Sequence, residues 1–446
     1  MVVRLFKRYK LLRCVFILLI LFNNGCIYRF SSIGNFTRED RVLIFAPHPD
    51  DETLGASGVI QRALKAGAKV KVVCITKGRL GITSKNGTKD FTSEQILEYG
   101  VKRGEETISA MQIAGLRRDD VIFLGYPDAG IADILTEHWE EYSPYLCELP
   151  ETARVLYPDV LSPEALLIGK SLLKDIKEIL LVFKPTKIFV SHPADLHPDH
   201  RALYVFLKVA LFDLSGQIKQ PQVFCCPIHM TNWPDLIYNK DLELNPPRQF
   251  KYTRYWWKKL ELTREEVETK RLMIACYKSE LKNYPWPLFI FCRKNELFGD
   301  YPVLKINKHT ERERGITKKK INIVTSQCFN SLSFAWIGDY LVLELSPSEI
   351  PNKDFYIDLI LLGYSKKVEF SMMPKIHIII REEGVMVRNK KTKIMNHGVE
   401  IKYSKNIILK IPLAIINNPD YIFNCLKSYV NNYYFDATAW RIIQLD

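Results

Sequence analysis

The chain has 446 residues, 47% of them hydrophobic, and carries a formal net charge of +13. It is long enough for two domains with hydrophobic cores of their own, and it contains no internal repeat. The basic runs at 4–13, 305–320 and 389–393 are far apart and no RNA- or DNA-binding motif accompanies them, which argues against a nucleic-acid-binding protein. An anionic membrane surface or an envelope glycan suits this charge better.

Residues 1–30 predict targeting to a membrane or beyond it. The basic stretch 4–13 precedes the short apolar run Cys14–Phe22. A membrane-spanning helix needs about 20 apolar residues, so this pattern is typical of a secretory signal. Lipidation at Cys26 and a signal anchor over residues 11–28 remain alternatives. In each case we expect a membrane-associated or exported protein.

Strands and helices are predicted to alternate over the next part of the chain. This alternation predicts a Rossmann-like α/β domain over residues 40–300, with a parallel sheet covered by helices on both faces. Two long loops, 77–98 and 129–162, are expected near the mouth of the sheet, where ligands bind. The expected elements are a strand from Arg41, a helix over 52–67, a strand over 69–76, a helix over 100–115, a strand over 120–124, a helix over 163–183 and a strand over 187–191.

Two clusters of polar residues follow two of these strands. The first is His48-Pro49-Asp50-Asp51-Glu52, and the second is His197-Pro198-Asp199-His200. Three adjacent carboxylates repel one another unless a cation binds there. Both clusters begin at the carboxyl end of a strand, so they are expected to form one site.

The residue types in these clusters indicate a catalytic metal. If Asp51 begins a helix, it turns inward together with His48, and His200 completes a set of two histidines and one carboxylate. Such a set leaves open positions for water and substrate, as in catalytic zinc and non-haem iron sites. The ten cysteines contain no CxxC pattern, so a structural zinc site has no support, and no disulfide pairing can be assigned.

The segment Ala46–Glu52 together with His197–His200 resembles the paired signatures of the PIG-L/LmbE-like de-N-acetylases. These zinc enzymes remove the acetyl group from N-acetylglucosamine-containing substrates. Arg103–Ala110 and Phe123–Asp128 resemble the intervening segments of the family. The resemblance covers about residues 40 to 300.

The resemblance implies a role for each residue of the two signatures. His48, Asp51 and His200 bind Zn²⁺, and Fe²⁺ would satisfy the same set. Asp50 is the general base that takes a proton from the zinc-bound water as it attacks the amide carbonyl. Zinc makes this possible near neutral pH, because it lowers the pKa of water to about 7. His197 stabilises the oxyanion or protonates the departing amine, and Asp199 orients a histidine.

Other polar residues near the signatures have two interpretations each. Arg103 and Asp128 are expected to contact the substrate, although a salt-bridged helix arginine and a turn aspartate would look the same. Glu52 is expected to cap the following helix. His192 either lines the pocket or packs inside the domain. The remaining histidines are unassigned: His138, His229, His309, His377 and His397.

One position departs from the family pattern. Some members carry a tyrosine just before the second signature, near the reacting carbonyl, whereas this chain has Pro193-Ala194-Asp195-Leu196 there. The contacts to the oxyanion and to the substrate are therefore not transferred to this chain.

The chain changes character after residue 300. Residues 301–320 are expected to be a charged linker. Short β-like runs then predict an antiparallel β-sandwich over 321–446, which would bind carbohydrate, position the enzyme or serve a structural purpose. The expected strands are 321–325, 340–345, 355–362, 367–370, 376–381, 406–411 and 439–444.

These features predict a metal-dependent deacetylase of an N-acetylglucosamine-containing glycan, glycolipid or glycoconjugate. An alternative enzyme is an amidase acting on a small acylated amino-sugar or thiol-sugar precursor. An alternative from another class is an inactive glycan-binding protein.

Overall fold

The computed structural model describes residues 29–79, 91–250, 255–283, 288–310, 318–322, 326, 328–348 and 354–446. The expected targeting segment therefore lies outside the described residues, apart from Arg29 and Phe30. Within the described ranges, no helix is both long and apolar enough to cross a membrane.

The N-terminal half is built on an eight-stranded sheet with the strand order β1-β7-β8-β6-β5-β2-β3-β4. The five strands from β6 to β4 in this order are parallel, and β8 runs antiparallel to both of its neighbours. The strands are β1 (Arg29–Ser32), β2 (Arg41–Ala46), β3 (Lys69–Thr76), β4 (Val121–Tyr126), β5 (Lys187–Ser191), β6 (Gln222–Cys226), β7 (Trp256–Glu261) and β8 (Asn295–Gly299).

Helices cover both faces of this sheet. Alternate residues of β2 belong to different cores: Val42 and Ile44 pack with α2, α3 and α7, whereas Leu43 and Phe45 pack with α4, α5 and α6. This period of two follows from the pleat of a strand. The helices are α2 (Asp51–Lys65), α3 (Ser93–Ile113), α4 (Ile131–Thr136), α5 (Gly169–Phe183), α6 (Pro198–Asp213), α7 (Arg264–Ile274) and α8 (Lys278–Asn283).

Strands β2 and β5 are neighbours at the point where the strand order reverses. From β2 the chain proceeds through β3 to β4 on one side, and from β5 it proceeds to β6 on the other. Ligands of such sheets bind at the carboxyl ends of the strands beside this switch point. Both signature segments begin there.

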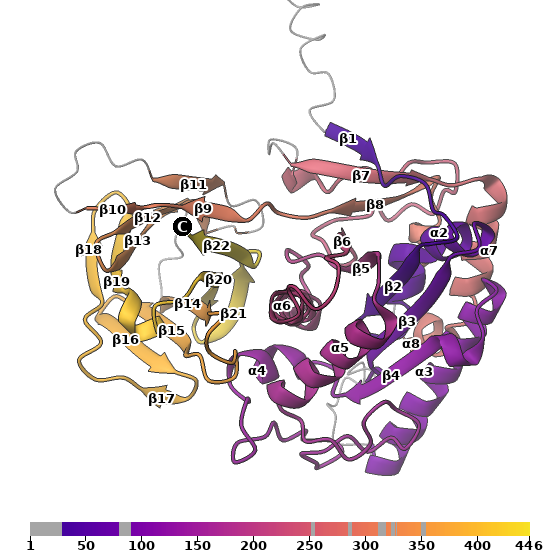
Figure 1. Ribbon diagram of the computed structural model, residues 1–446, viewed down its shortest axis with the longest axis horizontal. Helices are drawn as coiled ribbons and strands as arrows, with labels where there is room; N and C mark the ends of the chain where they lie inside the picture. Colours follow the sequence, from indigo (N-terminus) through magenta and orange to yellow (C-terminus); the bar gives the residue numbers. More distant parts are fainter. Residues whose placement is uncertain are drawn as a thin grey trace, which may run out of the picture.

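The C-terminal half is a two-sheet β-sandwich (Figure 1). One sheet has the order β10-β12-β13-β19-β18 with β11 on β12, and the other has the order β17-β16-β15-β14-β20-β22-β9 with β21 on β20. A shared apolar core fills the space between them. The strands are β9 (Leu304–Ile306), β10 (Lys308–His309), β11 (Lys319–Asn322), β12 (Phe329–Ile337), β13 (Tyr340–Pro347), β14 (Phe355–Tyr364), β15 (Lys375–Arg381), β16 (Gly384–Asn389), β17 (Thr392–Lys393), β18 (Glu400–Tyr403), β19 (Ile407–Pro412), β20 (Tyr421–Val430), β21 (Tyr433–Ala437) and β22 (Arg441–Leu445).

The predicted fold class is confirmed, but several elements differ from expectation. Helix α3 begins at Ser93 rather than near residue 100, because Thr92 and Gln95 form a reciprocal capping box. Helix α5 begins at Gly169 rather than 163, since Leu167 still pairs with Ala153 in extended conformation. Half of the loop expected over 77–98, residues 80–90, lies outside the described residues.

In the C-terminal half, too, some elements differ from the predicted ones. Residues 367–370 form a turn with an isolated bridge between Ser365 and Val368, not a strand. The expected linker 301–320 contributes β9, β10 and the start of β11 to the two sheets. Strands β12 and β20 were not expected because asparagine, serine and lysine interrupt their apolar alternation.

Candidate active site

The first signature occupies the turn between β2 and α2. Asp50 is the residue that precedes the helix, and its φ of 111° lies in a region that side chains other than glycine rarely adopt. Its carbonyl accepts the amide hydrogens of Thr53 and Leu54. Strained backbone of this kind costs about 1–3 kcal/mol and is concentrated at functional sites. The turn therefore holds Asp50 and Asp51 in fixed directions.

The second signature occupies the turn between β5 and α6. His197 precedes α6, and its Nδ1 accepts the amide hydrogen of Asp199 at 3.3 Å. Pro198 takes the first helical position, where a missing amide hydrogen costs nothing. Because β2 and β5 are neighbours, this turn faces the first one.

Three atoms from the two turns form a nearly equilateral triangle. His48 Nδ1 lies 3.3 Å from Asp51 Oδ2 and 3.2 Å from His200 Nε2, and His200 Nε2 lies 3.1 Å from the same Asp51 oxygen. Nitrogen and oxygen ligands at 2.0–2.1 Å from a tetrahedral zinc ion lie about 3.3 Å apart. The three predicted ligands therefore fit one zinc ion and leave its fourth position open.

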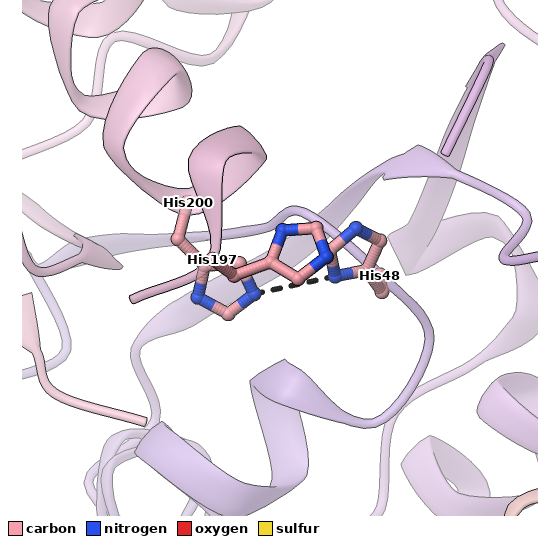
Figure 2. A group of neighbouring side chains, drawn as sticks. All are labelled: His48, His197 and His200. Carbon is pink, nitrogen blue, oxygen red and sulfur yellow. Dashed lines mark hydrogen bonds between the residues drawn. The ribbon is translucent and has the colours of Figure 1, made fainter. Parts of the chain in front are cut away.

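A third histidine is close to these ligands. Figure 2 shows His197 beside His48 and His200, and the rings of His48 and His197 meet edge to face with their centres 4.5 Å apart. Burial, followed by the charges of His48 and His200, lowers the pKa of His197 to about 2. His197 is thus a neutral imidazole, and because its Nδ1 accepts a hydrogen bond, its proton is on Nε2.

The surrounding carboxylates favour positive charge at the centre of the site. Burial alone would lower the pKa of His200, but Asp195 and Asp51 raise it to about 10. Burial would also lower the pKa of His48, which Asp128, Asp199 and Asp51 raise well above its usual range. A site that stabilises protons on two neighbouring histidines is electrostatically suited to a cation.

Asp199 and Asp128 lie on the far side of His48. Asp199 Oδ2 is 3.4 Å and Asp128 Oδ1 is 3.2 Å from His48 Nε2. Asp199 also accepts the amide hydrogens of Ala129 at 2.6 Å and Ile131 at 3.0 Å, which fixes the start of α4. The structure thus brings Asp199 and Asp128 to the same atom of His48, and the expected role of Asp199 in orienting a histidine stays a prediction.

Two residues lie in the site although the sequence analysis gave them no role there. Asp195 Oδ2 lies 3.3 Å from His200 Nδ1, within ion-pair distance but outside good hydrogen-bond geometry. The same carboxylate accepts the amide hydrogens of Ile228 and His229. The ring of His229 lies 4.8 Å from that of His200. The available signal was that His229 closely follows the carboxyl end of β6, the neighbour of β5.

Asp50 is held by Arg103. Arg103 is buried and donates to Asp50 Oδ2 at 3.3 Å and to the Pro49 carbonyl, and it also pairs with Glu280. Burial raises the pKa of Asp50 well above its usual range; Arg103 opposes this shift, and Asp51 and Glu52 add to it. These contacts occupy the guanidinium of Arg103, so its expected contact with a substrate stays a prediction.

Glu52 follows the predicted ligand Asp51 and is buried. Its carboxylate accepts the amide hydrogen of Asp50 at 3.2 Å and the hydroxyl hydrogen of Tyr277. Burial raises the pKa of Glu52 to about 7. This bond is made to the residue that precedes α2, and the capping role expected of Glu52 stays a prediction.

A pocket of about 220 Å³ adjoins the site at Asp128. Its walls combine aromatic side chains, among them Tyr145 and Tyr157, with the cationic residues Arg79 and Arg154.

Two other residues pack inside the domain. Trp139, from the same long loop as Tyr145, is fully buried and packs against Phe206 and Phe370. His192 also packs: it is fully buried, and its Nε2 lies 2.8 Å from the Tyr255 hydroxyl.

The α/β domain is doubly wound, and two histidines and one aspartate meet at its switch point. These two features define a class of protein with a candidate catalytic metal centre. Residues 43–211 match the model of the family described as PIG-L, GlcNAc-PI de-N-acetylase. The resemblance seen in the signatures is therefore confirmed over these residues.

Curated relatives match the same part of the chain. A 1D-myo-inositol 2-acetamido-2-deoxy-alpha-D-glucopyranoside deacetylase 1 of Saccharopolyspora erythraea is 34% identical over 169 residues, which is 37% of this chain and 51% of the relative. A probable N-acetyl-alpha-D-glucosaminyl L-malate deacetylase 2 of Bacillus subtilis is 29% identical over 129 residues, 27% of this chain and 56% of the relative. The chain thus spans about half the length of these relatives.

The chain is also similar to solved structures. The N,N'-diacetylchitobiose deacetylase of Pyrococcus horikoshii is 18% identical, with a TM-score of 0.34; the match covers 56% of this chain and 74% of that chain.

Proposed function

We propose that this protein is a zinc-dependent N-deacetylase that hydrolyses the acetamide of an N-acetylglucosamine-containing glycan, glycolipid or glycoconjugate. The observation that carries the proposal is the triangle of His48 Nδ1, Asp51 Oδ2 and His200 Nε2, with sides of 3.1–3.3 Å. The family match and the names of the relatives support the reaction and the sugar.

Zinc, when bound by these three residues, polarises the amide carbonyl and lowers the pKa of water. The residues around it supply the proton transfers and the orientation. The pKa of Asp50 is raised well above its usual range, as suits a carboxylate that accepts and returns a proton, so we assign it as general base. Arg103 keeps its carboxylate in place.

His197 is assigned to the oxyanion. It is neutral, and with its Nδ1 occupied by the Asp199 amide its Nε2–H is free to donate to a developing negative charge. A donor fixed before the reaction costs no reorganisation when the charge develops. Asp199 donates its amide hydrogen to this histidine, and its carboxylate holds the start of α4 and lies against His48.

The pocket beside Asp128 is proposed to hold the rest of the substrate. Tyr145 offers an aromatic face and Arg79 a positive charge. Aromatic faces pack on sugar rings, and guanidinium groups pair with carboxylates and phosphates. An N-acetylated amino sugar linked to an anionic group fits both features.

We further propose that the protein is membrane-associated or exported. The support is the pattern of residues 1–30 alone, a basic stretch followed by a short apolar run. Fractionation of cells expressing the full chain tests it: recovery entirely in the soluble intracellular fraction would contradict it.

The test of activity is acetate release by the purified full-length chain. The panel contains N-acetylglucosamine linked to inositol, N-acetylglucosamine linked to malate, and diacetylchitobiose, each before and after chelation and zinc restoration. We expect chelator-sensitive acetate from at least one of them. Asp50→Asn should retain zinc and lose turnover, His200→Ala should lose both, and His397→Ala, at a half-buried position in the sandwich, should change neither.

Other outcomes decide between the alternatives. Turnover of only small acylated amino-sugar or thiol-sugar compounds would favour the amidase. Bound glycan with bound zinc but no acetate from any substrate would favour a glycan-binding protein.

A further inference from the structure

Helix α6, which carries His200, lies between the two halves of the molecule (Figure 1). Its apolar residues point in all directions, and twelve of its sixteen residues are buried, from Asp199 through Leu207 and from Val209 through Leu211. A helix that is apolar all round needs cover on every side. The α/β domain provides only part of that cover.

The C-terminal sheet provides the rest. Alternate residues of β14 face different cores: Leu359 and Leu361 point into the sandwich, whereas Ile360 and Leu362 join the core that contains α6. At the far end of α6, Phe212 stacks on Tyr421 with ring centres 4.6 Å apart. The two halves thus share one continuous core around this helix.

One short segment of the C-terminal domain reaches both sides of the second signature. This segment, Thr438–Trp440, connects β21 to β22. The Trp440 amide donates to the carbonyl of Pro193 at 3.0 Å, before the signature. The guanidinium of Arg201, directly after His200, donates to the carbonyl of Thr438, also at 3.0 Å.

The segment is itself rigidly held. Thr438 exchanges two hydrogen bonds with Leu426 of β20, at 2.8 and 3.0 Å, and its carbonyl also accepts from the Cys425 thiol. Thr438 and Trp440 are both 4% exposed. Arg201 is equally buried, and burying its charge is favourable only while its hydrogen-bond partner is present.

We propose that Thr438–Trp440 is a clamp that positions the second ligand signature, so that the C-terminal domain is part of the scaffold of the metal site rather than a separable binding module. Pro193 and Arg201 are its two contact points, and Trp440 and Arg201 are positioning residues. The part of this inference that concerns zinc rests on the proposed function; the part that concerns the order of residues 193–205 does not.

The test compares two tryptophan variants of the full-length chain. Trp440→Ala removes the packing of the clamp. Trp336→Ala is the matched control. Trp336 lies on β12, in the sheet that does not contain β14, and is partly buried against the sandwich core. Hydrogen exchange of peptides covering 193–205 is measured without metal, and zinc affinity is measured by competition with a chromophoric chelator.

We expect Trp440→Ala to raise the exchange rate over 193–205 and to weaken zinc binding about 10-fold or more, as loss of groups that orient ligands does. Trp336→Ala should change neither. If Trp440→Ala does not fold, Arg201→Lys replaces it, because lysine keeps the charge but not the guanidinium geometry that reaches Thr438.

Wild-type exchange and wild-type zinc affinity in a folded Trp440→Ala or Arg201→Lys variant would overturn the clamp. A wild-type chain that binds no zinc would instead contradict the proposed function, while the exchange comparison would still decide whether the clamp exists.

Discussion

Asp195 Oδ2 lies 3.3 Å from His200 Nδ1, on the side of the imidazole opposite to the triangle of ligand atoms. Both residues are completely buried. A carboxylate in this place fixes the ring and increases its basicity. The residue that stands where some family members carry a tyrosine therefore supports a predicted metal ligand.

Asp195→Asn is predicted to weaken zinc binding about 10- to 100-fold, because the amide keeps the shape of the side chain but loses its charge. Chelator competition measures the affinity. Asp358→Asn is the control, since Asp358 is also buried and also contacts a histidine, His377, which is not a predicted ligand. Equal zinc affinities for the two variants would remove Asp195 from this role.

Arg103→Lys is predicted to lower kcat about 10- to 100-fold with little change in KM or zinc content, since misplacing a reacting group by an ångström costs a similar factor. The physical reason is that one ammonium group cannot hold Asp50, the Pro49 carbonyl and Glu280 together. Lys102→Gln, at the exposed neighbouring position, is the control. A higher KM with unchanged kcat would show instead that Arg103 binds the substrate.

Tyr145→Ala is predicted to raise KM about 10-fold and to leave zinc content unchanged, because Tyr145 lines the pocket but does not touch a predicted ligand. Steady-state kinetics with the best substrate of the panel measures it. Tyr142→Ala gives the comparison, since Tyr142 lies on the same loop and is 85% exposed. If both variants behave alike, the pocket does not bind substrate.

His192 is predicted to make the protein less stable in mild acid. Burial lowers the pKa of His192 to about 4, below the ordinary value of 6.5. The unfolded chain therefore binds a proton that the folded chain does not, and the free energy of unfolding falls as the pH decreases from 6.5 to 4, by up to about 1.4 kcal/mol per pH unit. Denaturant titrations across this range measure the slope.

His192→Gln removes the titrating group and should flatten that slope, whereas His397→Gln should leave it unchanged. An identical pH dependence in all three proteins would assign the acid sensitivity to other groups.

The site was largely predictable because its main residues lie in two short segments. The carboxyl ends of β2 and β5 could be located from their apolar runs, and a turn after each strand places His48, Asp51 and His200 within reach of one another. Strand β3 also has its expected bounds, Lys69–Thr76, since a glycine and a loop flank its apolar run.

The remaining features depend on contacts between distant segments. Asp195 and His229 enter the site through the pairing of β5 with β6, which no local pattern shows. The role of Arg103 depends on Glu280, almost 180 residues away in sequence. The cover of α6 by the C-terminal sheet was likewise not predicted, although the apolar residues all round this helix indicate that something must cover it.

The adjacency of β2 and β5 has a consequence for how the protein folds. His48 and His200 are 152 residues apart, so the ligand set does not exist in any local fragment and forms only when the centre of the sheet is assembled. An ion that binds the assembled set, and not the unfolded chain, shifts the folding equilibrium of the whole domain by about 2.7 kcal/mol when its concentration is 100 times Kd. The availability of metal during synthesis would then determine how much of the chain reaches the folded state.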